Sequence, residues 1–128
     1  MTYYFAQTLD APFDEAVART RKALADHGFG VISEIDVQAT LAAKLGVPFR
    51  RYLILGACNP QLAYEALQLE PRVGTMLPCN VLVRDVGDGR TEVAAINPVT
   101  SMVGIDNADL HAQAARVAEK LRDAVDSL

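Results

Sequence analysis

The chain has 128 residues, a formal net charge of −4, 51% hydrophobic residues and 22% charged residues. This length predicts one domain with one hydrophobic core, over residues 1–128. The acidic charge, without a dense Lys/Arg cluster, argues against the electrostatic attraction on which non-specific nucleic-acid binding depends. No apolar run approaches the roughly 18 residues of a membrane helix, and the N-terminus lacks the pattern of a signal peptide. We therefore expect a cytoplasmic protein without nucleic-acid or membrane partners.

Two patterns open the chain. Residues 2–7 are rich in aromatic side chains and predict a first strand. Pro12 suits the first position of a helix, and the acidic residues close behind it favour the positive end of the helix dipole. The apolar stripe of this helix ends at Gly28, so we expect a long amphipathic helix that packs on another element.

The next segment predicts a strand and a short helix. Residues 29–37 alternate between apolar and polar side chains, and this alternation places Val31 and Ile35 on the same face of a second strand. Asp36 can accept hydrogen bonds from the backbone at the start of a short helix, and Gly46 ends that helix. The short helix is therefore expected to begin where the second strand ends.

The first cysteine lies between a third strand and a third helix. Residues 49–57 predict a strand whose centre, residues 53–55, is apolar on both faces, which is typical of a strand inside a sheet. Asn59 is a good helix cap and Pro60 is tolerated directly after it. Cys58 thus precedes a helix N-terminus, where the partial positive charge favours a thiolate over a thiol.

A hairpin and a long helix complete the chain. Two strands are expected over residues 80–86 and 90–96, because the Gly-Asp-Gly turn between them supplies the positive φ that tight turns need. Asp106 or Asn107 caps a last helix with one buried stripe. This element order predicts an α+β fold of two layers, in which two long helices cover one face of an antiparallel sheet.

The two cysteine junctions resemble a known family. The motifs are Gly56-Ala57-Cys58-Asn59-Pro60 and Leu77-Pro78-Cys79-Asn80-Val81, followed by the Gly-Asp-Gly hairpin and Asn97-Pro98. They look like the signature of the family known as domain of unknown function 302. The resemblance covers nearly the whole chain and implies a curved antiparallel sheet of about five strands, similar in outline to TATA-box-binding protein. It also implies a homodimer and no established biochemical activity.

Five residues are candidates for a functional site. Cys58 and Cys79 are the candidate catalytic residues. If their strands are antiparallel neighbours, which the resemblance favours, both thiols lie at the same end of the sheet. Asn59 and Asn80 are candidate binding residues, because each follows a cysteine and carries an amide that donates and accepts hydrogen bonds. His111 flanks the buried stripe of the last helix and is the third candidate binding residue.

Four interpretations of the cysteine junctions stay open. Both cysteines can be small buried apolar residues. They can form a redox or sulfur-handling pair, in which one thiolate attacks and the other resolves. The third interpretation is a soft-metal or haem-type site. Two cysteines without CxxC spacing fall short of the four ligands of a structural zinc. We therefore assign no metal or cofactor. The fourth is a pocket for a small ligand, which needs about 300 Å³ or more.

Two hypotheses for the function follow. The first is a cysteine-based redox or sulfur-relay protein, with Cys58 as the nucleophile and Cys79 as the resolving thiol. The alternative is a non-catalytic homodimer that binds a small ligand or has a structural role, with both cysteines buried. The sequence lacks the GxGxxG, GxSxG and HExxH motifs of common enzyme classes, and it leaves open whether the protein is an enzyme.

Overall fold

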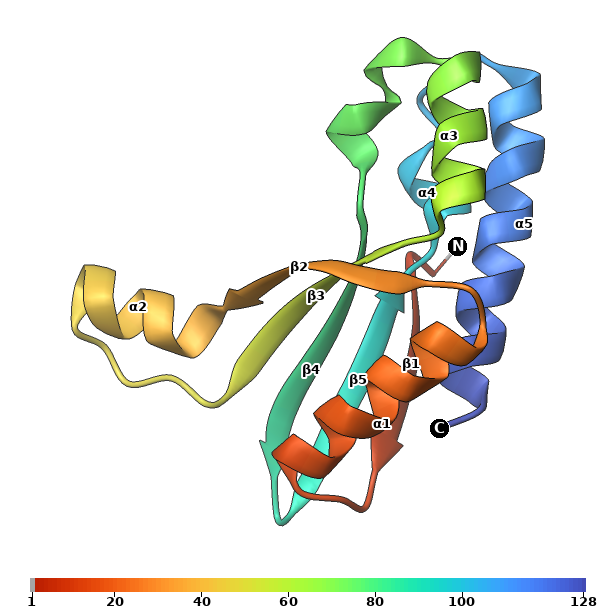
Figure 1. Cartoon of the computed structure of the whole chain (residues 1–128). Helices are drawn as coiled ribbons and strands as arrows, with labels where there is room; N and C mark the ends of the chain where they lie inside the picture. Colours follow the sequence, from red (N-terminus) through yellow and green to blue (C-terminus); the bar gives the residue numbers. More distant parts are fainter. Residues whose placement is uncertain (1) are drawn as a thin grey trace.

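The computed structural model describes residues 2–128 and consists of a five-stranded antiparallel sheet with two long helices on one face (Figure 1). The strands lie in the order β1-β5-β4-β3-β2. The elements are β1 (Tyr4–Leu9), α1 (Phe13–Asp26), β2 (Gly30–Asp36), α2 (Val37–Leu45), β3 (Tyr52–Cys58), α3 (Pro60–Leu69), the 3-10 helix η1 (Pro71–Met76), β4 (Cys79–Gly87), β5 (Arg90–Ile96), α4 (Pro98–Ser101) and α5 (Ala108–Asp126). The predicted α+β fold is confirmed.

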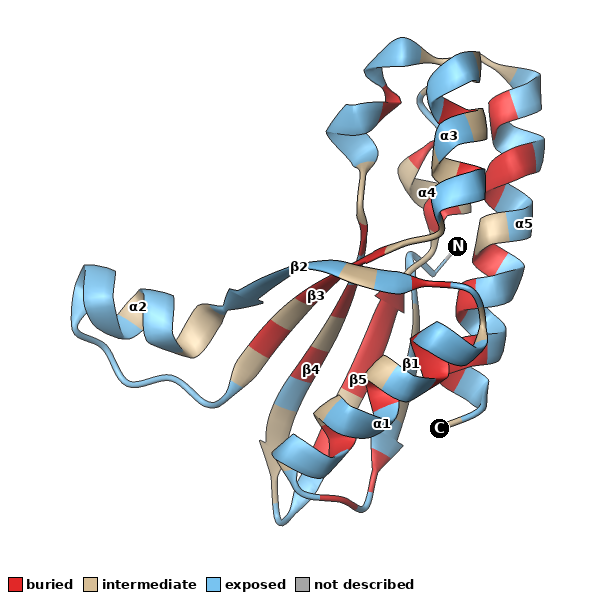
Figure 2. Ribbon diagram, in the orientation of Figure 1, coloured by how far each residue is buried: buried red, intermediate tan, exposed pale blue. Residues whose placement is uncertain are grey.

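The main core lies between the sheet and the two long helices, α1 and α5. Alternate residues of neighbouring strands point toward these helices, and Leu55, Val81 and Val93 are fully buried there. Leu24 of α1 and Leu121 of α5 are buried against them, and Figure 2 shows buried residues along the sides of α1 and α5. Each such side chain stabilises the fold by about 1.5–3 kcal/mol, so this layer holds the helices on the sheet.

Side-chain caps fix where three of the helices begin. Asp36, Asn59 and Asn107 each accept a hydrogen bond from the backbone N–H three residues later, at 2.9, 3.1 and 3.0 Å. Such caps satisfy backbone donors that the first helical turn leaves free. The predicted caps of α2 and α3 are confirmed, and Asn107 rather than Asp106 caps the last helix.

Strand β2 differs from the predicted pattern. Its register with β3 shifts between Val31 and Ser33, so that Val31 lies opposite Ala57 and Ile35 lies opposite Ile54. One extra residue in a strand reverses the alternation of every side chain beyond it. Val31 therefore faces the helices and Ile35 the opposite side, and the prediction that they share a face is wrong.

Two short helical segments were not predicted. No helix was expected between β5 and the last helix or directly after α3, but α4 and η1 form there. Both are shorter than the window of about 11–18 residues over which an apolar helical period becomes visible. They matter because they help to build a second, smaller apolar cluster beyond the end of the sheet, which consists of Ala66, Val73, Met102, Leu110 and Ala114.

The opposite face of the sheet has no helix packed on it within the described chain (Figure 1). Tyr3, Tyr4 and Ile35 are among its exposed side chains. Helix α2 projects away from α1 and α5 (Figure 1). None of its side chains is buried (Figure 2). Its Leu45 is 68% exposed. The described chain thus has an uncovered sheet face and a helix, α2, that buries no side chain.

Leu55→Ala is expected to lower the free energy of unfolding by about 2–5 kcal/mol, because it removes buried methyl groups and leaves a cavity in the main core. Leu45→Ala makes the same chemical change on α2 and should alter stability by less than about 0.5 kcal/mol. Urea unfolding followed by circular dichroism measures both values. Equal losses for the two variants would contradict this placement of the core.

Candidate functional site

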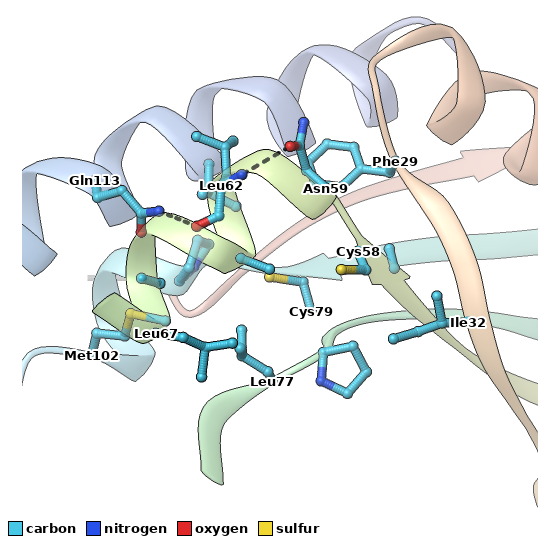
Figure 3. A pocket seen from close by; sticks show the side chains of 16 residues that line it. Phe29, Ile32, Cys58, Asn59, Leu62, Leu67, Leu77, Cys79, Met102 and Gln113 are labelled. Carbon is cyan, nitrogen blue, oxygen red and sulfur yellow. Dashed lines mark hydrogen bonds between the residues drawn. The ribbon is translucent and has the colours of Figure 1, made fainter. Parts of the chain in front are cut away.

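A pocket of about 320 Å³ lies at the end of the sheet, where the chain enters and leaves the strands that carry the cysteines (Figure 3). Helices α3, α4 and α5 form its other walls. Most of the lining is apolar and includes Phe29, Leu62, Leu67, Leu77, Met102 and Val117. The pocket therefore lies between the main core and the smaller cluster beyond the sheet.

The pairing of β3 with β4 brings both cysteine junctions to this pocket. The two strands are antiparallel, and Ala57 lies opposite Cys79. Cys58 therefore leaves the sheet at the end where Cys79 enters it, as predicted for antiparallel neighbours. Both cysteines line the pocket. The prediction that the two junctions share one end of the sheet is confirmed.

The two thiols are not bonded to each other. Both are free cysteines, and no hydrogen bond joins them within residues 2–128. Because Ala57 and Cys79 are opposite each other, their side chains lie on the helix-covered face, and alternation turns the next residue, Cys58, toward the other face. The structure thus brings both cysteines to the pocket but does not pair their thiols.

Cys79 is a buried, neutral thiol. Its side chain is 8% exposed and belongs to the main core. Burial raises the pKa of Cys79 to about 11, with a smaller electrostatic contribution from Cys58. Cys58 is half-buried and is the more accessible of the two thiols.

Asn59 reaches the pocket but is already engaged. Its Oδ1 accepts the backbone N–H of Leu62 and caps α3, at 3.1 Å. Its Nδ2 lies so near Gly28 that a Cβ there would be 3.1 Å away, and Gly28 has a φ of +87°. A glycine at this position therefore allows the end of α1 to pass close to the start of α3.

Asn80 and His111 lie away from the pocket. Asn80 is exposed and borders a groove on the uncovered sheet face, together with Tyr4 and Tyr52. His111 Nε2 donates to the carbonyl oxygen of Met102 at 3.1 Å, on the exposed flank of α5. Of the five candidate residues, the structure therefore brings together Cys58, Cys79 and Asn59.

Gly56 in the first motif has a packing role. A Cβ at this position would collide with the hydroxyl of Ser33 and lie 2.6 Å from Cγ of Pro78. Both neighbours come from the segments that flank β3, so a larger residue would push β2 or the entry to β4 away. The glycine thus lets three segments approach closely beside the pocket.

Gln113 of α5 lines the pocket and was not among the candidate residues. It is 3% exposed, and its Nε2 donates to the backbone carbonyl of Leu62 on α3. It follows Leu110 by three residues and precedes Val117 by four, so it lies on the buried stripe of its helix. A polar residue inside an apolar stripe is the signal that could have identified it.

Within residues 2–128, no group of three or more His, Cys, Asp and Glu side chains is arranged to hold a metal ion. No helix in the same range is long and apolar enough to cross a membrane.

Comparison with known proteins gives two matches of wide coverage. The family described as "Domain of unknown function DUF302" matches residues 5–128. The crystal structure of an uncharacterized conserved DUF302 protein from Bacillus stearothermophilus is similar, with a TM-score of 0.90, 27% sequence identity and 98% of each chain covered. No curated protein matches this sequence. The chain therefore belongs to the DUF302 family.

Proposed function

We propose that this chain binds a small, neutral, mainly apolar molecule in the pocket at the end of the sheet. The pocket is the observation that carries this proposal. Its 320 Å³ is within the range of about 300–1,000 Å³ that is typical of ligand sites. Among residues 2–128, those that line it include no Asp, Glu, Lys, Arg or His. An apolar molecule is stabilised there by leaving water.

The redox or sulfur-relay alternative has weaker support. A relay needs one thiolate that attacks and a second thiol in reach of the product. With its pKa raised to about 11, Cys79 is a thiolate in only about 0.01% of molecules at pH 7. Cys58 remains the candidate nucleophile, but the structure offers it no activated partner in Cys79. Non-catalytic binding is therefore the function that we favour.

A homodimer is the second part of the proposal. Within the described residues, each chain has a sheet face without a helix and, in α2, a helix that buries no side chain. Exposed apolar surfaces of this kind mark sites of contact with another chain. In a twofold dimer the same contact occurs twice, so a second copy would cover both surfaces at once. The cytoplasmic location stays a prediction.

Ala63→Phe is expected to block the pocket, because Ala63 lies on its wall at a half-buried position of α3. Toluene titrated into the wild type should shift the NMR signals of Leu62, Leu67 and Leu77. The variant should bind toluene at least about fivefold more weakly, which corresponds to the loss of about 1 kcal/mol of apolar contact. Ala112→Phe, on the exposed side of α5, is the control and should bind like the wild type. Unchanged toluene binding by Ala63→Phe would refute the site.

Alkylation by iodoacetamide tests the two thiols separately. In Cys58→Ser only Cys79 can react, and its rate should stay low at neutral pH and rise only as the pH approaches about 11, because the thiolate is the reacting species. In Cys79→Ser only the more accessible Cys58 can react, and its alkylation rate is the comparison. Rapid alkylation of Cys79 at pH 7 would contradict its burial and return the redox alternative to first place.

Light scattering after size exclusion tests the homodimer. The wild type is expected at twice the chain mass of 13.8 kDa. Tyr4→Lys places a charge on the uncovered sheet face and should shift the protein toward monomer, because burying an unpaired charge is costly. Tyr64→Lys makes the same change on α3, where Tyr64 is 63% exposed, and should leave the dimer intact. A monomeric wild type would rule out the dimer.

A further inference from the structure

The side chain of Gln113 has a fixed orientation in the pocket wall. It crosses from α5 to α3, where its Nε2 donates to the backbone carbonyl of Leu62 (Figure 3). Only 3% of the residue is exposed. Because this bond holds the nitrogen end of the amide, the oxygen end is directed away from that carbonyl. The pocket therefore has a buried amide whose two ends are distinguishable.

The oxygen of this amide is an available acceptor. Among residues 2–128, no donor to Gln113 Oε1 is present, whereas every side-chain nitrogen or oxygen that is sealed from solvent has a partner. Gln113 Oε1 must therefore be reachable by a water-sized molecule. Gln113 borders both the pocket and an outer groove between α3 and α5. Figure 3 shows its oxygen on the side of Met102, which borders the pocket and not that groove.

The other amide in the lining does not offer a second acceptor. Asn59 Oδ1 already accepts the N–H of Leu62 as the cap of α3. Figure 3 shows the nitrogen of Asn59 directed away from the two cysteines. Gln113 Oε1 is thus the side-chain amide oxygen that the pocket can present to a ligand.

We infer that the ligand carries one hydrogen-bond donor, a hydroxyl or an N–H group, on an otherwise apolar frame, and that it donates to Gln113 Oε1. This inference rests on the proposed function. A ligand without a donor would cover this oxygen and leave it unpaired, which weakens binding. A carboxylate or ammonium group would leave water without an opposite charge to meet it in the lining.

The volume sets the size of this ligand. The pocket holds about 320 Å³, near the lower end of the range of about 300–1,000 Å³ that is typical of ligand sites, so the ligand is small. A bicyclic aromatic amine or a short aliphatic alcohol satisfies the size, the neutrality and the single donor together.

Indole and 1-methylindole test the donor directly. The two probes share the same rings, but methylation removes the N–H. Titrated into the full chain and followed by NMR, indole should bind about fivefold more tightly than 1-methylindole, although the methylated probe is the more hydrophobic. In Gln113→Met, which keeps the chain length and lacks the acceptor, this ratio should fall to one or below. Gln68→Met, at an exposed position of α3, should keep the wild-type ratio.

The outcomes separate the two proposals. Equal or tighter binding of 1-methylindole by the wild type would overturn the inference about the donor and leave the apolar site in place. If neither probe shifts the signals of pocket residues, both the inference and the proposed function are overturned. The wild-type comparison needs no variant, so it decides the question even if Gln113→Met fails to fold.

Discussion

The antiparallel pairing of β3 with β4 is the constraint on which the site depends. Its register places Ala57 opposite Cys79, so the chain leaves β3 and enters β4 at the same end of the sheet. Helix α3 starts immediately beyond β3, and η1 leads back into β4. The connection between the two strands is thus built outside the sheet, against α4 and α5. The pocket lies where this extension meets the main core.

The apolar surroundings of the pocket decide which chemistry it favours. The burial that raises the pKa of Cys79 also penalises any other charge at this position. Reactive cysteines need the opposite environment, in which nearby positive charge stabilises the thiolate. A neutral ligand has no such requirement. Gln113 then supplies a polar group in the apolar wall. Its hydrogen bond to the carbonyl of Leu62 fixes which atom of the amide faces a ligand. Specificity in such pockets comes from a few placed polar groups.

Local chemistry made much of the fold predictable. Asp36 and Asn59 cap helices through contacts with residues three positions away, and the turn at residues 87–89 requires positive φ over a few residues. The meeting of the cysteine junctions followed from an antiparallel pairing of their strands, which the family resemblance favoured. The shift in β2 and the exposed side of Asn80 were not predictable, because both depend on register with another strand. Gln113 was missed because its role depends on a helix that lies 51 residues away in sequence.

The position of a bound apolar molecule distinguishes the pocket from the uncovered sheet face as the ligand site. Intermolecular nuclear Overhauser effects between toluene and the methyl groups of the full chain locate it without any substitution. We expect contacts with Leu62, Leu67 and Met102, at the end of the sheet. Contacts with Ile54 and Leu82 in place of these would put the ligand on the uncovered sheet face and rule out the pocket as its site.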